Sequence, residues 1–393
     1  MENKNFNDRW IFILGFLTLL GLGAWIYQLM NGLVVTGMRN VVSWGLYIAA
    51  FMFFVGLSAG GLIVSSSATV FNIPAFKAVD KPAVILSTVC IILAALFIVV
   101  DLGSPERILY LLLHPQFQSP LMWDVIVITI YLIISLLYLR QMTSQKPDQE
   151  KMALLSKIAL PAAILVHSVT AWIFGLQIAR VSWHSPLLAP LFVASALDSG
   201  LALLILILAG LEHFSDYKVD AKLYSSLAGL LAVFVAVDAF FIFSEILTAS
   251  YPGEENVMAT LRLLLTGPLA IFFWTQVIFG LIVPFVILSN AAYRLQKKLV
   301  LIAAALIVLG VFCKRIWLLL SSFLVPLVGG APGITLGQFE PNANPAKIQN
   351  IWAVFGSYFP TWVEFAIFIG IIALGGIMFT MASRKLLWSS AKS

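Results

Sequence analysis

The sequence predicts an all-α, polytopic transmembrane helix bundle of about ten spans, and three observations predict it. Hydrophobic residues make up 61% of the 393 residues and charged residues only 10%, whereas a soluble domain averages about 25% charged residues. The apolar residues gather in long runs, each close to the roughly 20 residues that a helix needs to cross a bilayer. These runs lack the period-two alternation of an outer-membrane barrel. A soluble enzyme, a disordered chain, a disulfide scaffold and a nucleic-acid binder are therefore excluded.

The expected spans follow one another with short connections. They cover residues 10–30, 44–66, 83–101, 121–139, 158–179, 188–210, 223–246, 268–289, 299–320 and 358–381. Two connections are longer: the polar stretch 140–157 and the Gly/Pro/Asn-rich stretch 322–352. Neither could hold a soluble domain, so we expect one integral membrane domain over residues 1–393.

Basic residues predict the orientation of these spans. If the N-terminus is cytoplasmic, the inside segments hold 16 Lys and Arg residues and the outside segments hold 5, while Lys314 and Arg315 lie within a span. Cytoplasmic segments carry the excess of Lys and Arg in membrane proteins. We therefore expect a multi-pass protein with both termini in the cytoplasm.

Cysteine and histidine positions limit the redox groups that the chain could hold. The two cysteines, Cys90 and Cys313, both lie in expected spans, and an iron–sulfur cluster normally needs four cysteine ligands. We interpret both as small apolar side chains. Of four histidines only His167 lies within an expected span, so no pair is available for a transmembrane haem. The sequence thus predicts neither haem nor an iron–sulfur cluster, and no metal site.

Ionisable residues within spans are costly, and they are candidates for function. Four carboxylates lie near the outer ends of their spans: Asp101, Asp124, Glu245 and Glu364. Lys314 and Arg315 lie about one and a half turns below the outer end of their span. His167 and Asp198 fall near mid-membrane, and Asp238 lies two turns below Glu245. The inner half of every span lacks Asp, Glu, Lys, Arg and His. Helix caps and internal ion pairs are the structural alternative for these groups.

The outer connections differ from the Lys-rich inner ones. Three of them mix proline, aromatic and single charged residues: "DLGSPERILYLLLHPQFQSPLMWD", "ARVSWHSPLLAP" and "SEILTASYPG". Such connections favour a fixed shape that contacts a partner or a ligand. Gly60 and Gly61 in "GLSAGGL" instead favour close packing of helices.

At these segments the chain resembles the NrfD/polysulfide-reductase family of membrane subunits, over essentially its whole length. The resemblance rests on "SWGLYIAAFMFFVGLSAGGL" at 43–62, on the connection at 101–124, on "HSVTAWIFGLQIARVSWHSPLLAPLFVASALDSGLAL" at 167–203 and on "YFPTWVEFAIFIG" at 358–370. The count of ten helices is similar to that of the larger branch of the family.

The resemblance implies a fold and a function. The fold would be two four-helix bundles, made of spans two to five and six to nine, with flanking helices. The function would be that of a haemless, quinone-reactive anchor in the cytoplasmic membrane of a prokaryote, serving electron transport in anaerobic respiration. Its cofactor would be a diffusible menaquinone or ubiquinone. Its partners would be an extracytoplasmic ferredoxin-like iron–sulfur subunit and a molybdopterin or other catalytic subunit, within membrane lipid.

The same resemblance suggests residue roles. A quinone pocket toward the outer face of the first bundle would use Trp44, Arg180 and His167 for binding and Asp101, Asp124 and His167 for proton exchange. By helix rise we expect His167 to lie roughly 15 Å deeper than Asp101 and Asp124. A possible proton path in the second bundle would include Asp198, Asp238, Glu245, Lys314 and Arg315.

A second reading comes from another class of protein. The same mid-membrane charges could serve a secondary transporter of an ion or small anion. Transporters of that class often show inverted repeats and broken helices, and no repeat is evident in this sequence. The terminal substrate, the direction of electron flow, the quinone type and proton translocation are left open by the sequence.

Overall fold

The structure, a computed structural model, describes residues 8–70, 74–144, 148–215, 217–325 and 356–387. Within these residues ten helices are long and apolar enough to cross a membrane, which confirms the predicted fold class. Nine of the spans are α1 (Asp8–Asn31), α2 (Leu46–Val70), α3 (Asp80–Asp101), α5 (Pro120–Met142), α6 (Gln149–Gly175), α7 (Leu188–Phe214), α8 (Ala221–Ser250), α13 (Lys297–Leu324) and α14 (Trp362–Leu387). The tenth combines α10 (Ala270–Trp274), π-helical turns at Thr275–Ile282 and α11 (Val283–Ser289).

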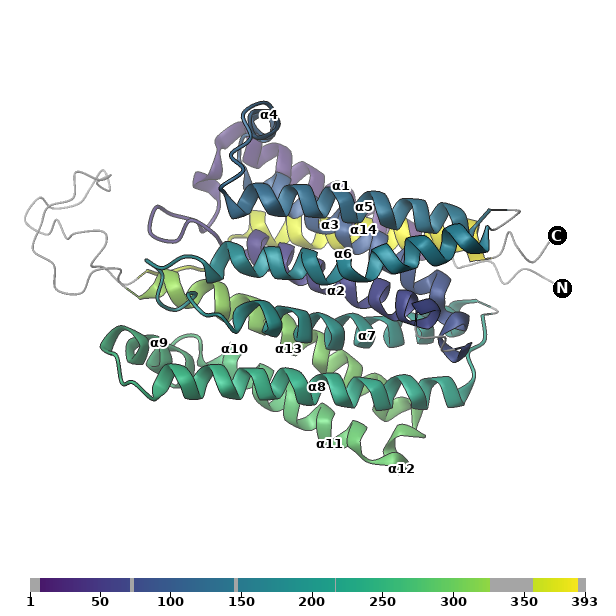
Figure 1. The fold of residues 1–393 in the computed structure, drawn as a ribbon. Coiled ribbons are helices and arrows are strands. Elements are labelled where there is room, and N and C mark those ends of the chain that lie inside the picture. The colour runs from purple at the N-terminus through teal and green to yellow at the C-terminus, as the bar shows by residue number, and fades with distance from the viewer. Residues whose placement is uncertain (1–7, 71–73, 145–147, 216, 326–355, 388–393) are drawn as a thin grey trace, which may run out of the picture.

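The helices pack as two groups of four with a flanking pair (Figure 1). The first bundle contains α2, α3, α5 and α6, and the second contains α7, α8, the α10–α11 span and α13. Helices α1 and α14 pack on each other, and α14 packs on α3. This is the arrangement that the resemblance implies.

The two ends of the bundle differ (Figure 1). We call the end where α1 begins and α14 ends the terminal face. The opposite end carries two short helices, α4 (Ile108–Leu113) and α9 (Glu255–Leu265), and we call it the α4/α9 face. The stretch expected as a loop at 322–352 falls mostly outside the described residues.

Glycine joins the two bundles where α2 crosses α7. A Cβ atom on Gly60 would overlap the backbone of Gly200, and one on Gly200 would overlap the backbone of Gly60. A Cβ atom on Gly61 would lie 2.7 Å from the carbonyl oxygen of Ala83 in α3. The glycines therefore let backbones approach, as small residues do at membrane helix interfaces, and this confirms the interpretation of "GLSAGGL".

Two helix starts correct the sequence analysis. Helix α6 begins at Gln149, inside the stretch expected to be a polar connection, because the Asp148 side chain caps it by accepting hydrogen bonds from the N–H groups of Glu150 and Lys151. Helix α3 begins at Asp80, three residues before the expected start. Asp80 is buried, so the expectation that the inner half of every span lacks charged residues is wrong.

The cysteine interpretation agrees with the structure. Cys90 in α3 and Cys313 in α13 are both buried and both free. Each takes the place of a small apolar side chain in the packed interior.

Candidate functional site

An aromatic cluster lies where α2, α6, α7 and α13 meet at the α4/α9 face. The indole of Trp44 stacks on that of Trp183 with ring centroids 6.1 Å apart, and both pack against Phe174 and Phe323. The guanidinium of Arg180 lies 4.7 Å from the centroid of Phe323, as a cation–π contact requires. Two residues predicted to bind the quinone, Trp44 and Arg180, are thus brought together.

Beside this cluster is a cavity of about 570 Å³, which we call the α2/α13/α14 pocket. Its walls come from the start of α2, the segment before α10, α13, residues 356–360 and the start of α14. They are mostly apolar, with phenylalanine rings from Phe272, Phe312, Phe359 and Phe365. A large apolar pocket with few polar groups is typical of a small-molecule site.

The phenol of Tyr358 is a polar group in the wall of this pocket, next to Ser357. Its hydroxyl donates to Glu364 Oε1 at 2.5 Å and accepts the N–H of Leu46 at 2.7 Å. A Cβ atom on Gly45 would overlap this hydroxyl, so the close approach needs glycine there. Burial, and then the negative charge of Glu364, raise the pKa of Tyr358 above its usual value, so the phenol is protonated at neutral pH.

Glu364 is fixed by the backbone on its other side. Its Oε2 atom accepts N–H groups from Gly37 at 2.6 Å and from Thr361 at 2.9 Å, and the side chain is fully buried. Tyr358 was not predicted as a site residue, and Glu364 was noted as an ionisable candidate without a role, although both belong to the "YFPTWVEFAIFIG" segment that carried the resemblance.

Asp101 belongs to this region and not to the first-bundle interior. Its carboxylate interacts electrostatically with Glu364 and Tyr47. Tyr47 donates a hydrogen bond to Gln28 Oε1 at 2.6 Å, and Gln28 donates in turn to the carbonyl of Val100. The Oδ1 atom of Asp101 is buried and has no hydrogen-bond partner among the described residues.

The other two predicted catalytic residues lie within the first bundle. Asp124 is buried and its Oδ1 atom accepts a hydrogen bond from Thr170 at 2.7 Å. Thr170 is one turn from His167 on α6, and the buried Nε2 atom of His167 has no partner among the described residues. Because Asp124 bonds Thr170, one turn from His167, the difference in depth between Asp124 and His167 is about 5 Å by helix rise. The expected difference of 15 Å is therefore wrong for Asp124. The reason is that α6 ends at Gly175, four residues before the expected end.

Below His167, hydroxyl groups line the first bundle. Tyr131 bonds Ser87 at 2.7 Å and Ser58 at 3.1 Å. Nearer the terminal face, further buried polar atoms lack a hydrogen-bond partner in the part of the chain that the structure describes. These are the hydroxyl oxygens of Ser65, Ser66, Ser135 and Tyr138 and the Oδ1 atom of Asp80. Unpartnered polar atoms in a buried site favour ordered water.

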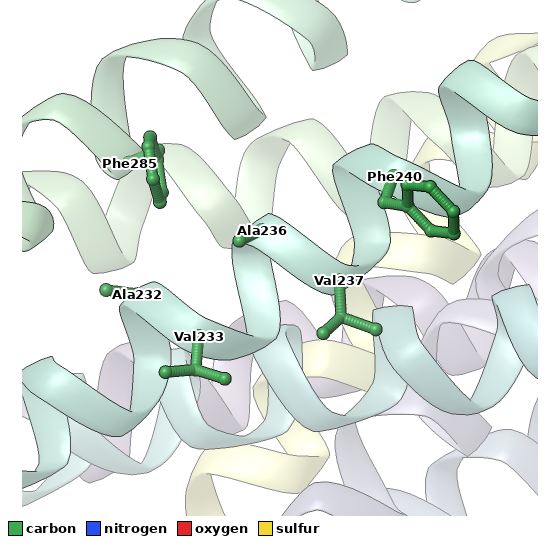
Figure 2. Close-up of a pocket in the computed structure, with 6 residues that line it drawn as sticks. All are labelled: Ala232, Val233, Ala236, Val237, Phe240 and Phe285. Atoms are coloured by element: carbon green, nitrogen blue, oxygen red, sulfur yellow. The ribbon is translucent and has the colours of Figure 1, made fainter.

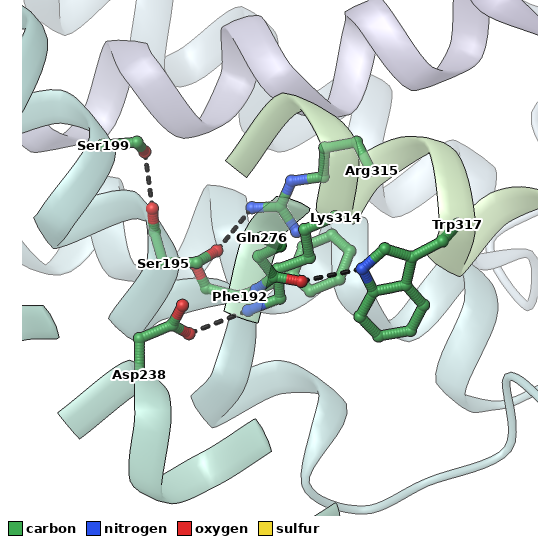
Figure 3. Close-up of polar contacts among 8 residues, drawn as sticks. All are labelled: Phe192, Ser195, Ser199, Asp238, Gln276, Lys314, Arg315 and Trp317. Carbon is green, nitrogen blue, oxygen red and sulfur yellow. Dashed lines mark hydrogen bonds and ion pairs between the residues drawn. The ribbon is translucent and has the colours of Figure 1, made fainter. Parts of the chain in front are cut away.

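The second bundle buries an ionic cluster (Figure 3). Lys314 donates to Asp238 Oδ1 at 2.8 Å, and both side chains have no exposed surface. Arg315 donates to Ser195 Oγ at 2.7 Å and lies over the ring of Phe192. Asp198 is buried nearby and acts electrostatically on Asp238, Lys314 and Arg315, while neither of its oxygens has a described hydrogen-bond partner.

Arg315 also connects the two bundles. Its Nη2 atom would lie 3.6 Å from a Cβ atom built on Gly56 of α2, and its charge acts on His167. The predicted mid-membrane residues His167 and Asp198 are therefore part of one electrostatic neighbourhood across the bundle interface.

The π-helical turns add a residue that the sequence analysis missed. Gln276 is buried and its Oε1 atom accepts a hydrogen bond from Trp317 Nε1 at 2.7 Å, while its Nε2 atom has no described partner. π-Helical turns occur frequently at functional sites. A glutamine within "FFWTQVIFG" was the signal that could have been used.

A second cavity, which we call the α8/α9 pocket, lies beside this cluster and has more polar groups on its walls than the first. It has a volume of about 450 Å³ and lies between the α6–α7 connection, the end of α8, helix α9 and α13. Glu245, predicted for the proton path, lines it together with His184 and Glu254. The charges of Lys314 and Asp238 below act on Glu245.

A third hollow is of a different kind. It lies between α8 and α11 and contains only apolar side chains, which are Ala232, Val233, Ala236, Val237, Phe240 and Phe285 (Figure 2). It offers no polar group that could orient a ligand, and in a bilayer it faces the lipid side of the second bundle.

The predicted site residues therefore fall into three groups, where a first-bundle pocket and a second-bundle proton path were expected. The first group lies around the α2/α13/α14 pocket: Trp44 and Arg180 belong to the aromatic cluster beside it, and Asp101 interacts electrostatically with Glu364. Asp124 and His167 lie in the first bundle. Asp198, Asp238, Glu245, Lys314 and Arg315 form the second-bundle cluster with its pocket.

Comparison with known proteins identifies relatives of the whole chain. The family model described as polysulphide reductase, NrfD, matches residues 34–326. The chain is 35% identical to a protein of Halobacterium salinarum, provisionally named as a membrane subunit of dimethyl sulfoxide reductase, over 96% of this chain and 90% of that protein. It is 29% identical to an Hdr-like menaquinol oxidoreductase integral membrane subunit of Archaeoglobus fulgidus, over 95% and 91%. It is 24% identical to a selenate reductase subunit of Mesobacillus selenatarsenatis, over 94% and 91%.

Proposed function

The chain belongs to the NrfD/polysulfide reductase family, and from this premise we propose that it is the quinone-reactive membrane subunit of a multi-subunit oxidoreductase. The relatives above are named as subunits of dimethyl sulfoxide, menaquinol and selenate oxidoreductases, two of them as membrane subunits. These names favour a redox role over the alternative of a secondary transporter. The menaquinol in one name supports menaquinone over ubiquinone as the diffusible partner.

The observation that most supports this function is the α2/α13/α14 pocket with its Tyr358–Glu364 pair. The apolar walls suit a quinone ring and the start of its isoprenoid tail. Tyr358 Oη already donates to Glu364 and accepts from Leu46, so its remaining lone pair can accept the hydroxyl proton of a quinol. As that proton arrives, Tyr358 passes its own proton to Glu364, so the phenol oxygen keeps one proton throughout. The same relay run in reverse serves quinone reduction.

Residues around the pocket would assist this exchange. Asp101 lies within electrostatic range of Glu364 and could receive its proton. The cluster of Trp44 and Arg180 lies beside the pocket, next to Gly45 and Leu324 of its lining, and would separate the ring from the α4/α9 face. Three residues of the predicted set thereby keep a role close to the quinone.

A second candidate location is the Asp124–Thr170–His167 group. It is favoured by the unpartnered Nε2 atom of His167, which could donate to or accept from a quinone oxygen. Of the two locations we favour the α2/α13/α14 pocket because it combines a cavity with a proton relay.

The basic-residue pattern supports an orientation in the cytoplasmic (inner) membrane. It would put both termini in the cytoplasm and the α4/α9 face outside. An extracytoplasmic ferredoxin-like iron–sulfur subunit would then dock on the α4/α9 face and receive or supply the electrons. A molybdopterin or other catalytic subunit would complete the complex.

Two proton routes are available to the site. The ionic cluster of the second bundle, with Glu245 at its pocket, would exchange protons with the α4/α9 face. The hydroxyl-lined half of the first bundle, beginning at Asp80, would lead to the terminal face. Quinone turnover that generates a membrane potential in proteoliposomes would support the second route, and electroneutral turnover would support the first.

The site is tested with Tyr358→Phe and Glu364→Gln in the assembled complex. We expect each to lower turnover of 2,3-dimethyl-1,4-naphthoquinol at least tenfold, about 1.4 kcal/mol in barrier. Dye-linked activity of the catalytic subunit should stay unchanged. His167→Ala should lower quinol turnover less than threefold. If His167→Ala lost tenfold while Tyr358→Phe stayed active, the ring would belong in the first bundle.

A further inference from the structure

The α8/α9 pocket holds no quinone in the proposal above, where only its Glu245 serves as a proton exit, and its lining has an unusual composition. The described residues that line it include two glutamates, Glu245 and Glu254, and no lysine or arginine. The nearest buried cation, Lys314, is already bonded to Asp238 at 2.8 Å. The pocket therefore presents negative charge without a matching positive group of its own.

The hydroxyl donors on its walls are already committed. The Ser185 hydroxyl, which lines the pocket, is hydrogen-bonded to the Glu245 side chain. Thr248 donates to the carbonyl of Ser244 and Ser321 donates to that of Leu318. Thr260 donates to the carbonyl of Asn256, so its contact with Ser182 at 2.7 Å uses the Ser182 proton. Each of these hydroxyls keeps only acceptor lone pairs for a ligand.

The nitrogen donors of the lining follow the same pattern. The indole N–H of Trp317 is used by Gln276. The Nδ1 atom of His184 lies 2.8 Å from the carbonyl of Gly175, and a carbonyl can only accept. In the neutral ring Nδ1 thus carries the proton, and Nε2 is left as an acceptor.

The polar groups of this cavity, set among apolar side chains, are acceptors and two carboxylates, which suit a ligand that brings several donors and positive charge. Quinone carbonyls and oxyanions bring acceptors, so they do not match. A metal ion does not match either, because no group of three His, Cys, Asp or Glu residues suited to one occurs among the described residues. A guanidinium, with five N–H donors, or an ammonium, with three, provides what the walls lack.

We infer that the α8/α9 pocket receives an arginine or lysine side chain of the subunit that docks on the α4/α9 face. The inference rests on the proposed function in that it needs such a partner. The pocket opens on that face, and Glu254 at the start of α9 stands on its wall as an exposed residue. Glu245 lies deeper, so a long basic side chain would pass the first carboxylate and reach the second.

Neighbouring glutamates provide a matched test. Glu254 and Glu255 are both exposed at the start of α9, but only Glu254 lines the pocket, and its side chain makes no capping hydrogen bond. We expect Glu254→Gln to lower the NaCl concentration that releases half of the partner subunits from the immobilised complex at least twofold. Glu255→Gln should leave that concentration unchanged. Equal effects of the two substitutions would overturn the inference.

A small cation tests the chemistry directly. Propylguanidinium chloride should release the partner from the wild-type complex at a concentration at least fivefold lower than NaCl. That difference should shrink at least twofold in the Glu254→Gln complex and persist in the Glu255→Gln complex. Release at equal concentrations of the two salts would contradict a basic side chain in the pocket. If the difference were present but the complex oxidised no quinol, the proposed function would fail while this inference stood.

Discussion

The two four-helix bundles bury polar groups in different ways. The first bundle holds neutral hydroxyls and single carboxylates, such as Tyr131 with Ser87 and Asp124 with Thr170. The second holds full charges of both signs in one place, with Lys314 bonded to Asp238 and Arg315 nearby. Burying an isolated charge costs far more than burying a hydroxyl. The second bundle therefore depends on charge pairing, whereas the first can exchange one hydrogen-bond partner for another.

The largest expected effect comes from breaking the pair in the second bundle. Lys314→Met leaves Asp238 charged and buried without its partner, which costs about 3–5 kcal/mol. We expect this variant to unfold at a much lower denaturant concentration in detergent. The double variant Lys314→Met with Asp238→Leu should recover most of the loss, because it removes both charges. A single variant as stable as the wild type would show that the pair is already solvated.

A smaller effect is expected where the two bundles meet. Gly200→Leu puts a side chain against the backbone of Gly60, and overpacking of this kind costs about 1–3 kcal/mol. The thermal midpoint should fall, and Gly210→Leu on the same helix serves as control because a Cβ atom there meets nothing within 4 Å. Equal shifts for both variants would mean that the bundles are not joined at this crossing.

The smallest effect should come from the first bundle. Ser87→Ala removes a hydrogen bond to Tyr131 that Ser58 can partly replace. Side-chain hydrogen bonds between membrane helices average about 0.6 kcal/mol, so we expect a loss of that size in chemical denaturation. A loss as large as that of Lys314→Met would remove the contrast between the two bundles.

The helices could be predicted from the sequence because each span is a long apolar run. Their ends could not, since they depend on local contacts: the Asp148 side chain caps α6 within a stretch that reads as polar, and α3 begins at the buried residue Asp80. The early start of α3 places Asp80 within a span, and the early end of α6 at Gly175 reduces the difference in depth between His167 and Asp124.

The sequence predicted many residues of the candidate site, but it predicted less well which of them lie together. Depth alone put Lys314 and Asp238 at similar levels, and the structure pairs them. Tyr358 and Glu364 combine with Gly37, Gly45 and Asp101 from the other end of the chain. The spacing of residues in the sequence does not predict these contacts between the two ends of the chain, because they depend on how α1 and α14 pack beside α3.

The α2/α13/α14 pocket also has a consequence for biosynthesis. Its walls extend from Gly45 at the start of the second span to Phe365 at the start of the last. The ribosome must therefore complete nearly the whole chain before this cavity can close, and the first-bundle helices are already inserted by then. A chain that stopped after α13 would contain both bundles but neither Tyr358 nor Glu364. Under the proposed function, we expect a nascent subunit to become competent only when the last helix arrives, and truncated products to be inert toward the quinone pool.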